Sequence, residues 1–159
     1  MKLYDSVDLN CELDYLAQIG VHKECRGRII EQTPYRCTVI FFNPNYYGDY
    51  ACAEVNKEYL TLVHTNNSRA NAEFAEWLNK TDVRNKTKFK PMLFREYDKV
   101  ELIAEKKKYA VQGVHKGMTG AITEPYSIGG CWNVIFTGSD GYDIAELEVN
   151  EEDIRLLQR

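Results

Sequence analysis

The sequence predicts a mainly β protein built from two copies of one small barrel. The first observation is an internal repeat, because residues 4–9 (YDSVDL) return as residues 97–102 (YDKVEL). The second is a series of short segments in which apolar and polar residues alternate, as they do in half-buried strands. The third is turn chemistry between these segments, including Asn-Pro-Asn at 43–45 and Gly-Ser-Asp-Gly at 138–141.

The repeat extends well beyond its first six residues. Gly-Val-His-Lys occurs at 20–23 and again at 113–116, at the same spacing and without a gap. Two later segments recur after shifts of a residue or two: 39–41 as 134–136, and 54–56 as 148–150. The shifts fall in turn-rich stretches, where insertion is tolerated.

Each copy contains several short strands in about 60 residues, a density that favours a small, strongly bent barrel. The expected strands are 7–9, 37–42, 51–55 and 59–63 in the first copy, and 100–102, 131–136, 145–149 and 154–157 in the second. We therefore expect a first barrel at residues 1–63, a linker at 64–95 and a second barrel at 96–159.

The linker region has a different character. Ser68 is a suitable N-cap for a helix over residues 69–78. Four residues of this segment share one helical face: Ala70, Phe74, Trp77 and Leu78. This pattern predicts a short amphipathic helix packed on a barrel, followed by a basic linker at 80–90 that ends at Pro91.

The second copy carries the motif Tyr-Asp-x-Val-x-Leu at 97–102, then Gly-Val-His-Lys-Gly-x-x-Gly-x-Ile at 113–122, an apolar strand and Gly-x-Asp. This arrangement resembles the Src-homology-3-like barrels of the KOW type, and more narrowly a small bacterial family of unknown function often encoded beside toxin genes. The resemblance implies two tandem Src-homology-3-like barrels, with the Gly-x-x-Gly segment forming the turn into the second strand. Because Glu24 stands where the second copy has Gly117, we expect the first copy to build this turn differently.

Charge is distributed unevenly along the chain. Both predicted barrels carry more Asp and Glu than Lys and Arg, whereas residues 64–95 are net basic, and the whole chain has a net charge of −4. The densest acidic stretch contains no base: Asp140, Asp143, Glu146, Glu148, Glu151, Glu152 and Asp153. Affinity for nucleic acid comes mainly from Lys and Arg, so acidic barrels argue against it.

The sequence supports neither enzymatic activity nor a metal or cofactor site. It contains no Walker loop, nucleophile elbow or zinc-protease motif. His22 and His115 occupy equivalent positions, but no further cluster of ligands completes a metal site, so we expect them to hold turns through hydrogen bonds. Asp5 and Asp98 are likewise expected to cap turns.

Surface recognition is the remaining class of function. An aromatic loop contributes Tyr46, Tyr47, Asp49 and Tyr50, a composition typical of protein-binding hot spots. The acidic stretch contributes Asp140, Asp143, Glu146, Glu148, Glu151 and Glu152, which suit a basic partner. In the alternative interpretation, the tyrosines pack on their own barrel and the acids form a solvated face.

The resemblance and the acidic barrels together indicate an immunity or antitoxin-type protein, which neutralises a basic nuclease toxin by stoichiometric occlusion. The alternatives are a nucleic-acid-associated tandem KOW-type module that uses the basic linker (Lys80, Arg84, Lys86, Lys88, Lys90 and Arg95), and a phage-encoded inhibitor of a host defence nuclease. Because no signal peptide or membrane segment is evident, a cytoplasmic location is expected. The sequence leaves the oligomeric state open.

Overall fold

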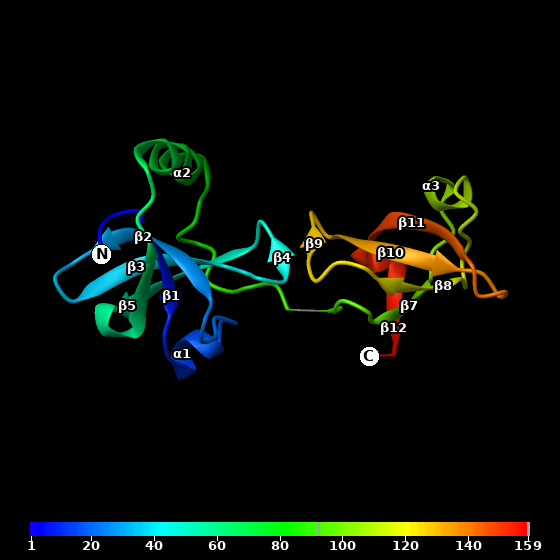
Figure 1. Cartoon of the computed structure of the whole chain (residues 1–159), viewed down its shortest axis with the longest axis horizontal. Coiled ribbons are helices and arrows are strands. Elements are labelled where there is room, and N and C mark those ends of the chain that lie inside the picture. Colours follow the sequence, from blue (N-terminus) through cyan, green and yellow to red (C-terminus); the bar gives the residue numbers. More distant parts are fainter. Residues whose placement is uncertain (92, 159) are drawn as a thin grey trace. The chain divides into compact units, whose positions relative to one another are not determined.

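A computed structural model describes residues 1–91 and 93–158 of the chain (Figure 1). The chain divides into two compact units, Met1–Pro44 with Gly48–Pro91, and Asn45–Tyr47 with Met92–Arg159. Both units consist mainly of strands, which confirms the expected β-rich class. Residues 64–91, expected as the first part of a linker, are counted with the first unit because their helix packs on its sheet.

The first unit is a five-stranded antiparallel sheet with the strand order β5-β3-β2-β1-β6. Its elements are β1 (Ser6–Leu9), α1 (Asp14–Ala17), β2 (Arg26–Gln32), β3 (Arg36–Phe42), β5 (Tyr50–Asn56), η1 (Lys57–Tyr59), β6 (Leu60–His64) and α2 (Ser68–Lys80). Bulges interrupt the register between β1 and β6 and between β2 and β3. Bulges bend and twist strands, so this sheet is curled.

The second unit repeats this plan. Its elements are β4 (Tyr46–Tyr47), β7 (Lys99–Leu102), α3 (Lys107–Ala110), β8 (Thr119–Ile122), β9 (Ser127–Ile128), β10 (Cys131–Thr137), β11 (Asp143–Asn150), η2 (Glu151–Asp153) and β12 (Ile154–Gln158). Strands β12, β7, β8 and β10 pair in this order, and β11 pairs with β10 as β5 pairs with β3. The short strands β4 and β9 add a parallel pair to the same sheet.

The alternating strand residues fill one core in each unit. The two cores use equivalent positions, so that Val7 and Leu9 correspond to Val100 and Leu102. One position differs greatly in size, because Cys37 of β3 is matched by Trp132 of β10. The Trp132 ring packs edge-on against Phe94, with ring centroids 5.6 Å apart. Such T-shaped aromatic pairs contribute beyond the apolar area that they bury.

Helix α2 covers the outer face of the first sheet (Figure 1). Phe74 from the helix packs with Ile30 and Ile40 from the strands in a third apolar cluster. The N-cap is Asn67, one residue before the expected Ser68, and its side chain accepts a hydrogen bond from the Ala70 amide at 2.9 Å. No helix in residues 1–91 and 93–158 is long and apolar enough to cross a membrane.

The turn before β2 corrects an expectation. Glu24 has φ +71° and Gly117 has φ +90°, so the first copy forms the same left-handed turn without glycine. The hydrogen bonds also match, because the amides of Glu24 and Gly117 each donate at 2.8 Å to the carbonyls of Leu9 and Leu102. The turn is therefore not built differently in the first copy; it has the same geometry with a more strained residue.

The two histidines hold equivalent turns, as expected. His22 Nδ1 lies 2.7 Å from Glu12 Oε1, and His115 Nδ1 lies 2.9 Å from Glu105 Oε1. In each copy the second carboxylate oxygen accepts a hydrogen bond from the next backbone amide along the chain. Hydrogen bonds to both carboxylate oxygens fix the loop that joins the short helix to the following strand, and this pair of histidine–glutamate contacts is a structural feature of the repeat.

Candidate functional site

Strand β11 places three carboxylates on one face of the second sheet. Asp143, Glu146 and Glu148 are exposed, and we call them the acidic face. Glu146 lies opposite Ile135 and Glu148 opposite Asn133 in the register with β10, while the intervening Leu147 packs toward the core. A register shift between Phe136 and Thr137 brings Asp143 onto the same face. The β-strand period of two, adjusted by this bulge, therefore aligns the three acids.

No ion pair links the acidic face to a base in residues 1–91 and 93–158. Glu146 accepts one hydrogen bond, from the Thr123 hydroxyl at 2.8 Å. Two bases of the second unit pair elsewhere, with Arg155 bonded to Glu101 and Lys106 to Asp153. The three carboxylates thus present uncompensated negative charge to solvent.

The remaining acids of the predicted stretch have other surroundings. Asp140 is exposed in the β10–β11 turn, and its carboxylate accepts a hydrogen bond from the Tyr142 backbone amide at 3.1 Å. Glu151 accepts a hydrogen bond from the Trp132 indole N–H at 3.3 Å, and a carboxylate oxygen of Glu152 lies 3.8 Å from Lys106 Nζ. Glu151 is thus bonded to a residue of the second core, whereas Glu152 is exposed.

Asp153, at the end of the acidic stretch, is buried. Burial raises the pKa of its carboxyl, but hydrogen bonds from Lys106 and Tyr109 outweigh this and hold the pKa below its usual range. Asp153 is therefore a charged structural residue of the core edge.

A cavity of about 200 Å³ lies beside the acidic face. Six side chains line it: Glu124, Tyr126, Ile128, Cys131, Asn133 and Glu148. Two carboxylates, a phenol ring and an aliphatic chain suit a cationic side chain, whose charged end binds carboxylates and whose stem packs on apolar surface. Of this group, only Glu148 belongs to the acidic stretch that is evident in the sequence. Strand pairing brings Glu124 and Tyr126 close to Glu148, from which they are more than twenty positions away in the sequence. No local sequence pattern indicates this proximity.

The structure divides the predicted aromatic loop. Tyr46 is 2% exposed and belongs to the second core, where its ring centroid lies 5.5 Å from that of Trp132. Its hydroxyl accepts a hydrogen bond from the Leu93 amide at 2.9 Å. Tyr47 is 76% exposed and lies in register with Ile128, which is 57% exposed and lines the cavity beside Glu148. Tyr47 is thus an exposed residue of the second unit, in register with a residue that lines this cavity.

Asp49 and Tyr50 belong to the first unit. Asp49 is buried and forms an ion pair with Lys86, and it accepts hydrogen bonds from the Lys90 amide and the Asn43 amide group. Burial raises the pKa of Asp49, but these bonds hold it below its usual range. Tyr50 packs edge-on against Trp77 of α2, with ring centroids 5.4 Å apart. Asp49 thus binds the segment that follows α2, through Lys86 and Lys90, and Tyr50 packs against α2 itself.

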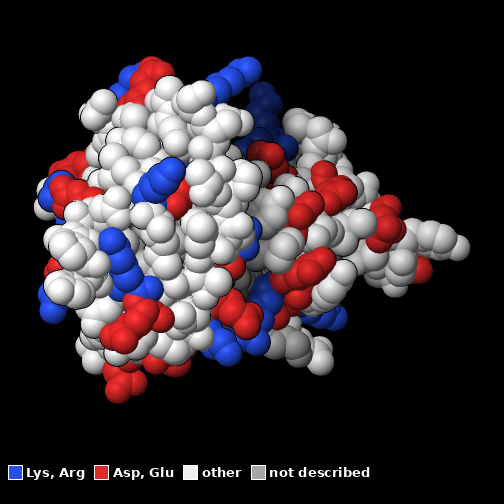
Figure 2. All heavy atoms as spheres, turned by 60° about the vertical axis from the view of Figure 1, so that its left-hand side comes forward, with Lys and Arg blue, Asp and Glu red and all other residues white. Residues whose placement is uncertain are grey.

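The basic segment at 80–90 is partly neutralised by its own unit. Lys86 pairs with Asp49, Arg84 with Glu31 and Lys80 with Glu76. On the face seen in Figure 2, Lys and Arg side chains are interspersed with Asp and Glu. This arrangement leaves less free positive charge for a phosphate backbone than the sequence alone indicates.

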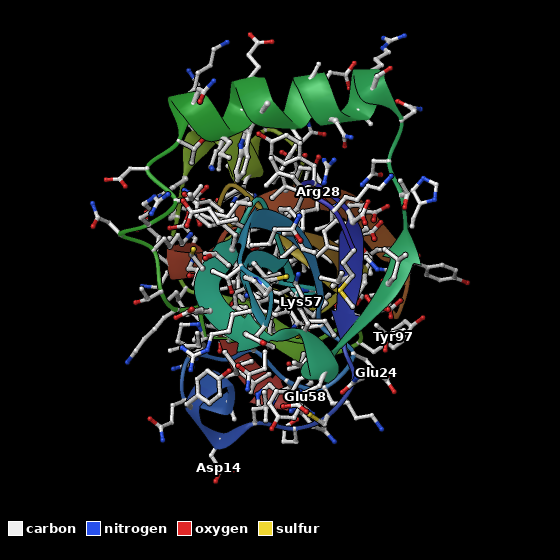
Figure 3. All side chains as sticks on the ribbon, turned by 90° about the vertical axis from the view of Figure 1, so that its left-hand side faces the viewer. Asp14, Glu24, Arg28, Lys57, Glu58 and Tyr97 are labelled. Atoms are coloured by element: carbon white, nitrogen blue, oxygen red, sulfur yellow. The ribbon has the colours of Figure 1, made fainter. Side chains whose placement is uncertain are left out.

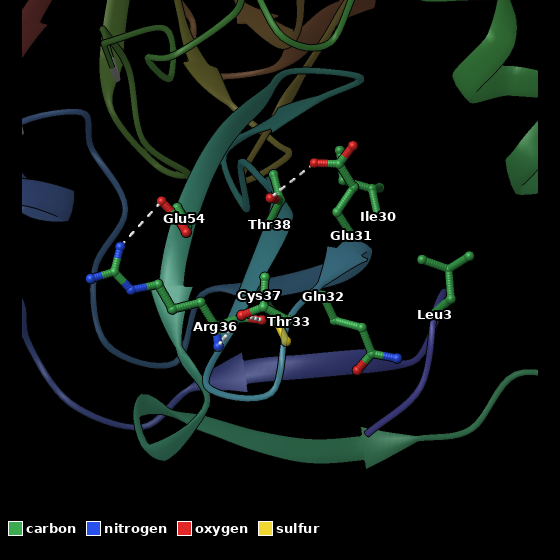
Figure 4. A pocket seen from close by; sticks show the side chains of 9 residues that line it. All are labelled: Leu3, Ile30, Glu31, Gln32, Thr33, Arg36, Cys37, Thr38 and Glu54. Carbon is green, nitrogen blue, oxygen red and sulfur yellow. Dashed lines mark hydrogen bonds and ion pairs between the residues drawn. The ribbon is translucent and has the colours of Figure 1, made fainter.

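A second cavity, of about 570 Å³, lies beside the β2–β3 hairpin of the first unit (Figure 4). Its charged groups have partners: Arg36 lies 3.5 Å from Glu54, and Glu31 binds Arg84 and the Thr38 hydroxyl. The thiol of Cys37 faces this region from a buried position, and burial raises its pKa. A raised pKa disfavours the thiolate, so this cysteine is not activated as a nucleophile.

Residues 1–91 and 93–158 contain no group of three or more His, Cys, Asp or Glu side chains arranged to hold a metal ion.

Comparisons with known proteins give little guidance. No protein-family model matches the chain, and no curated protein matches it. Among solved structures, a match is found to the crystal structure of the AGD34 part of AGDP1 from Arabidopsis thaliana. It has 7% sequence identity, covers 98% of this chain and 82% of that chain, and has a TM-score of 0.29. A TM-score this low establishes neither a shared fold nor a shared function.

Proposed function

We propose that this chain is a toxin-neutralising protein of the immunity or antitoxin type, which binds a basic protein partner through the acidic face. The observation that carries the proposal is the alignment of Asp143, Glu146 and Glu148 on one exposed sheet face, with no ion pair to a base in the part of the chain that the structure describes. Uncompensated charge of one sign accelerates capture of an oppositely charged partner and favours it over others. A nuclease toxin fits, because its nucleic-acid site must be basic.

The finer architecture belongs to the same proposal. We infer that each unit is a Src-homology-3-like barrel. The support is the shared strand order. In each unit the strand that opens the repeat, β1 or β7, lies between the next strand of the repeat and the last strand, and a 3₁₀ turn precedes that last strand. Such barrels serve many functions, so the acidic face, and not the barrel, supports the proposed function.

The test is protection of cells that express the cognate toxin. The native chain should preserve growth, and a variant with Asp143→Asn, Glu146→Gln and Glu148→Gln should lose protection. Its affinity for the purified toxin should fall about tenfold or more, with a reduced dependence on salt. If the cells die equally with and without the native chain, the proposal is wrong.

A matched control changes the same amount of charge elsewhere. Asp14, Glu58 and Glu73 are exposed acids of the first unit; Asp14 and Glu58 are labelled in Figure 3. The triple variant Asp14→Asn, Glu58→Gln, Glu73→Gln should protect as well as the native chain. Equal loss in both triple variants would mean that net charge, and not the acidic face, determines binding.

A further inference from the structure

Strand β11 is an edge strand. It pairs with β10 along one side, and within residues 1–91 and 93–158 no strand pairs with its other side. An unpaired strand edge presents a row of N–H and C=O groups to which another chain can add.

Two observations identify the β11 residues whose backbone groups point away from β10. The amide of Asn150 donates to the Tyr109 hydroxyl at 3.2 Å and so faces outward. Backbone groups alternate in direction along a strand, so those of Glu146 and Glu148 also face outward. The repeat gives the same answer, because Cys52 of β5 is the equivalent of Glu146 and its amide also faces away from the sheet.

In the first unit this edge is already occupied. The Cys52 amide donates to the carbonyl of Lys86 at 3.0 Å. The occupying segment is basic, and its side chains pair with the unit's own acids, Arg84 with Glu31 and Lys86 with Asp49. The chain thus contains one example of a basic segment held against this edge of the repeated sheet.

Within residues 1–91 and 93–158, no backbone segment is bonded to the corresponding edge of the second unit. The outer face also differs in part: Ile30, which α2 covers in the first unit, is replaced by Thr123, whereas Ile40 is retained as Ile135. Cys52 is replaced by Glu146, whose carboxylate accepts the Thr123 hydroxyl. Hydroxyls and carboxylates beside Ile135 leave less apolar area for a helix to cover, and their charge is complementary to a basic segment.

We propose that the β11 edge binds an extended, basic segment of the protein partner as an added strand. This inference rests on the proposed function and specifies the chemistry of the partner. Backbone hydrogen bonds to Glu146 and Glu148 would hold the added strand, and Lys or Arg at alternate positions would reach their carboxylates. The neighbouring cavity, with Glu124 and Tyr126, takes one basic side chain.

The probe is a synthetic peptide with the sequence of residues 83–90, VRNKTKFK, in which Arg84, Lys86, Lys88 and Lys90 alternate. Its addition to the full chain should shift the amide resonances of β11 and slow hydrogen exchange at the amides of Glu146 and Glu148. Absence of binding at low salt would overturn the proposal.

Backbone methylation separates strand addition from attraction between charges. One peptide carries N-methyl groups at the positions of Asn85 and Thr87, and the other at those of Lys86 and Lys88, so the two isomers have equal charge. An added strand bonds through one edge only, so one isomer should bind about tenfold more weakly than the other. Equal affinities would overturn the proposal.

Two variants of the chain provide the reciprocal test. Glu146→Gln removes the charge and keeps the amide N–H, whereas Glu146→Pro removes both. Proline is tolerated on an edge strand where the N–H faces outward, so both variants should fold. Strand addition predicts that Glu146→Pro binds the peptide about tenfold more weakly than Glu146→Gln; equal binding would contradict it.

The outcomes also separate this inference from the proposed function. If the toxin binds the native chain and not the acidic-face variant, while the Glu146 and Glu148 amides gain no protection from exchange, strand addition is wrong and the proposed function stands. If the peptide adds to β11 but the toxin is not neutralised, the edge is a binding site and the proposed function is wrong.

Discussion

Glu24 and Gly117 occupy the same position in the two repeats and share a left-handed backbone, with φ +71° and +90°. A residue with a Cβ atom is strained in this conformation, whereas glycine adopts it freely. The first copy therefore retains a turn geometry for which its residue is poorly suited.

Glu24→Gly should stabilise the chain by about 0.5–1 kcal/mol, because relief of strain exceeds the entropy that glycine adds to the unfolded state. The reverse change, Gly117→Glu, should destabilise it by about 1–2 kcal/mol. The free energy of unfolding in urea is the measurement. A destabilised Glu24→Gly variant would show that the Glu24 side chain makes a contribution larger than the strain.

Each copy also has a glycine in the strand after this turn, Gly27 in β2 and Gly120 in β8, and it is required because the adjacent strand approaches closely. A Cβ atom on Gly27 would lie 2.7 Å from the Ile40 carbonyl oxygen, and one on Gly120 would lie 2.4 Å from that of Ile135. Both obstacles are backbone of the adjacent strand, so they cannot move aside cheaply. Gly120→Ala should cost about 2 kcal/mol or more, measured by thermal unfolding. Thr119→Ala, one residue earlier in β8, is the control and should cost less; equal costs would mean that the close approach is relieved by sheet movement.

The repeat and most of the strands could be predicted from the sequence, because alternation of apolar residues depends on neighbours in the chain. The expected strand at 37–42 is β3, which begins one residue earlier, and the expected strand at 131–136 is β10, which ends one residue later. The expected helix at 69–78 is α2, longer at both ends. These boundaries depend on the capping residue and the last hydrogen bonds, which local patterns define poorly.

The candidate site was less predictable, because it depends on contacts between distant residues. The alternation of acids in β11 indicated an acidic strand, and the structure places Glu146 and Glu148 on one exposed face. The tyrosine-rich loop gave no sign that Tyr46 enters the second core while Asp49 pairs with Lys86 in the first unit. Composition describes which side chains a loop carries, but only tertiary structure decides which of them are buried.

The Asp49–Lys86 pair should contribute to the stability of the first unit. Asp49→Asn would leave the Lys86 ammonium without its carboxylate beside a buried amide, at a cost of about 2 kcal/mol. Urea unfolding of the full chain measures it. Glu76→Gln removes an exposed helical ion pair with Lys80 and, as the matched control, should change stability by about 0.5 kcal/mol or less. Equal effects would mean that the Asp49 pair behaves as a surface ion pair.

Acid should weaken the two histidine–glutamate contacts. A hydrogen bond from the following backbone amide, together with the bond to histidine, lowers the pKa of Glu12 and of Glu105 from the usual carboxyl value. A carboxyl whose pKa is lower in the folded state stabilises the fold above its unfolded pKa, near pH 4.3, and this contribution is lost as pH falls through the folded pKa.

Urea unfolding measured between neutral pH and pH 3 should therefore show falling stability at the acid end. A variant with Glu12→Gln and Glu105→Gln should lose less stability over this range than the native chain. Its stability at neutral pH should be lower, because the charged carboxylates are absent. An unchanged slope below pH 4.3 would assign the acid sensitivity to other carboxyls, with Asp49 and Asp153 as the next candidates because their pKa values are also lowered.

Hydrogen exchange distinguishes the two sheet edges without any ligand. The Cys52 amide is bonded to the Lys86 carbonyl, whereas the equivalent Glu146 amide faces outward on the unpaired side of β11. Exchange requires an accessible, unbonded N–H, so Glu146 should exchange much faster than Cys52 in the free chain. The amide of Asn150, bonded to the Tyr109 hydroxyl, is a control within the same strand and should exchange more slowly than Glu146. Comparable protection of Glu146 and Cys52 would show that the β11 edge is covered in solution, and an edge that is covered has no place for an added strand.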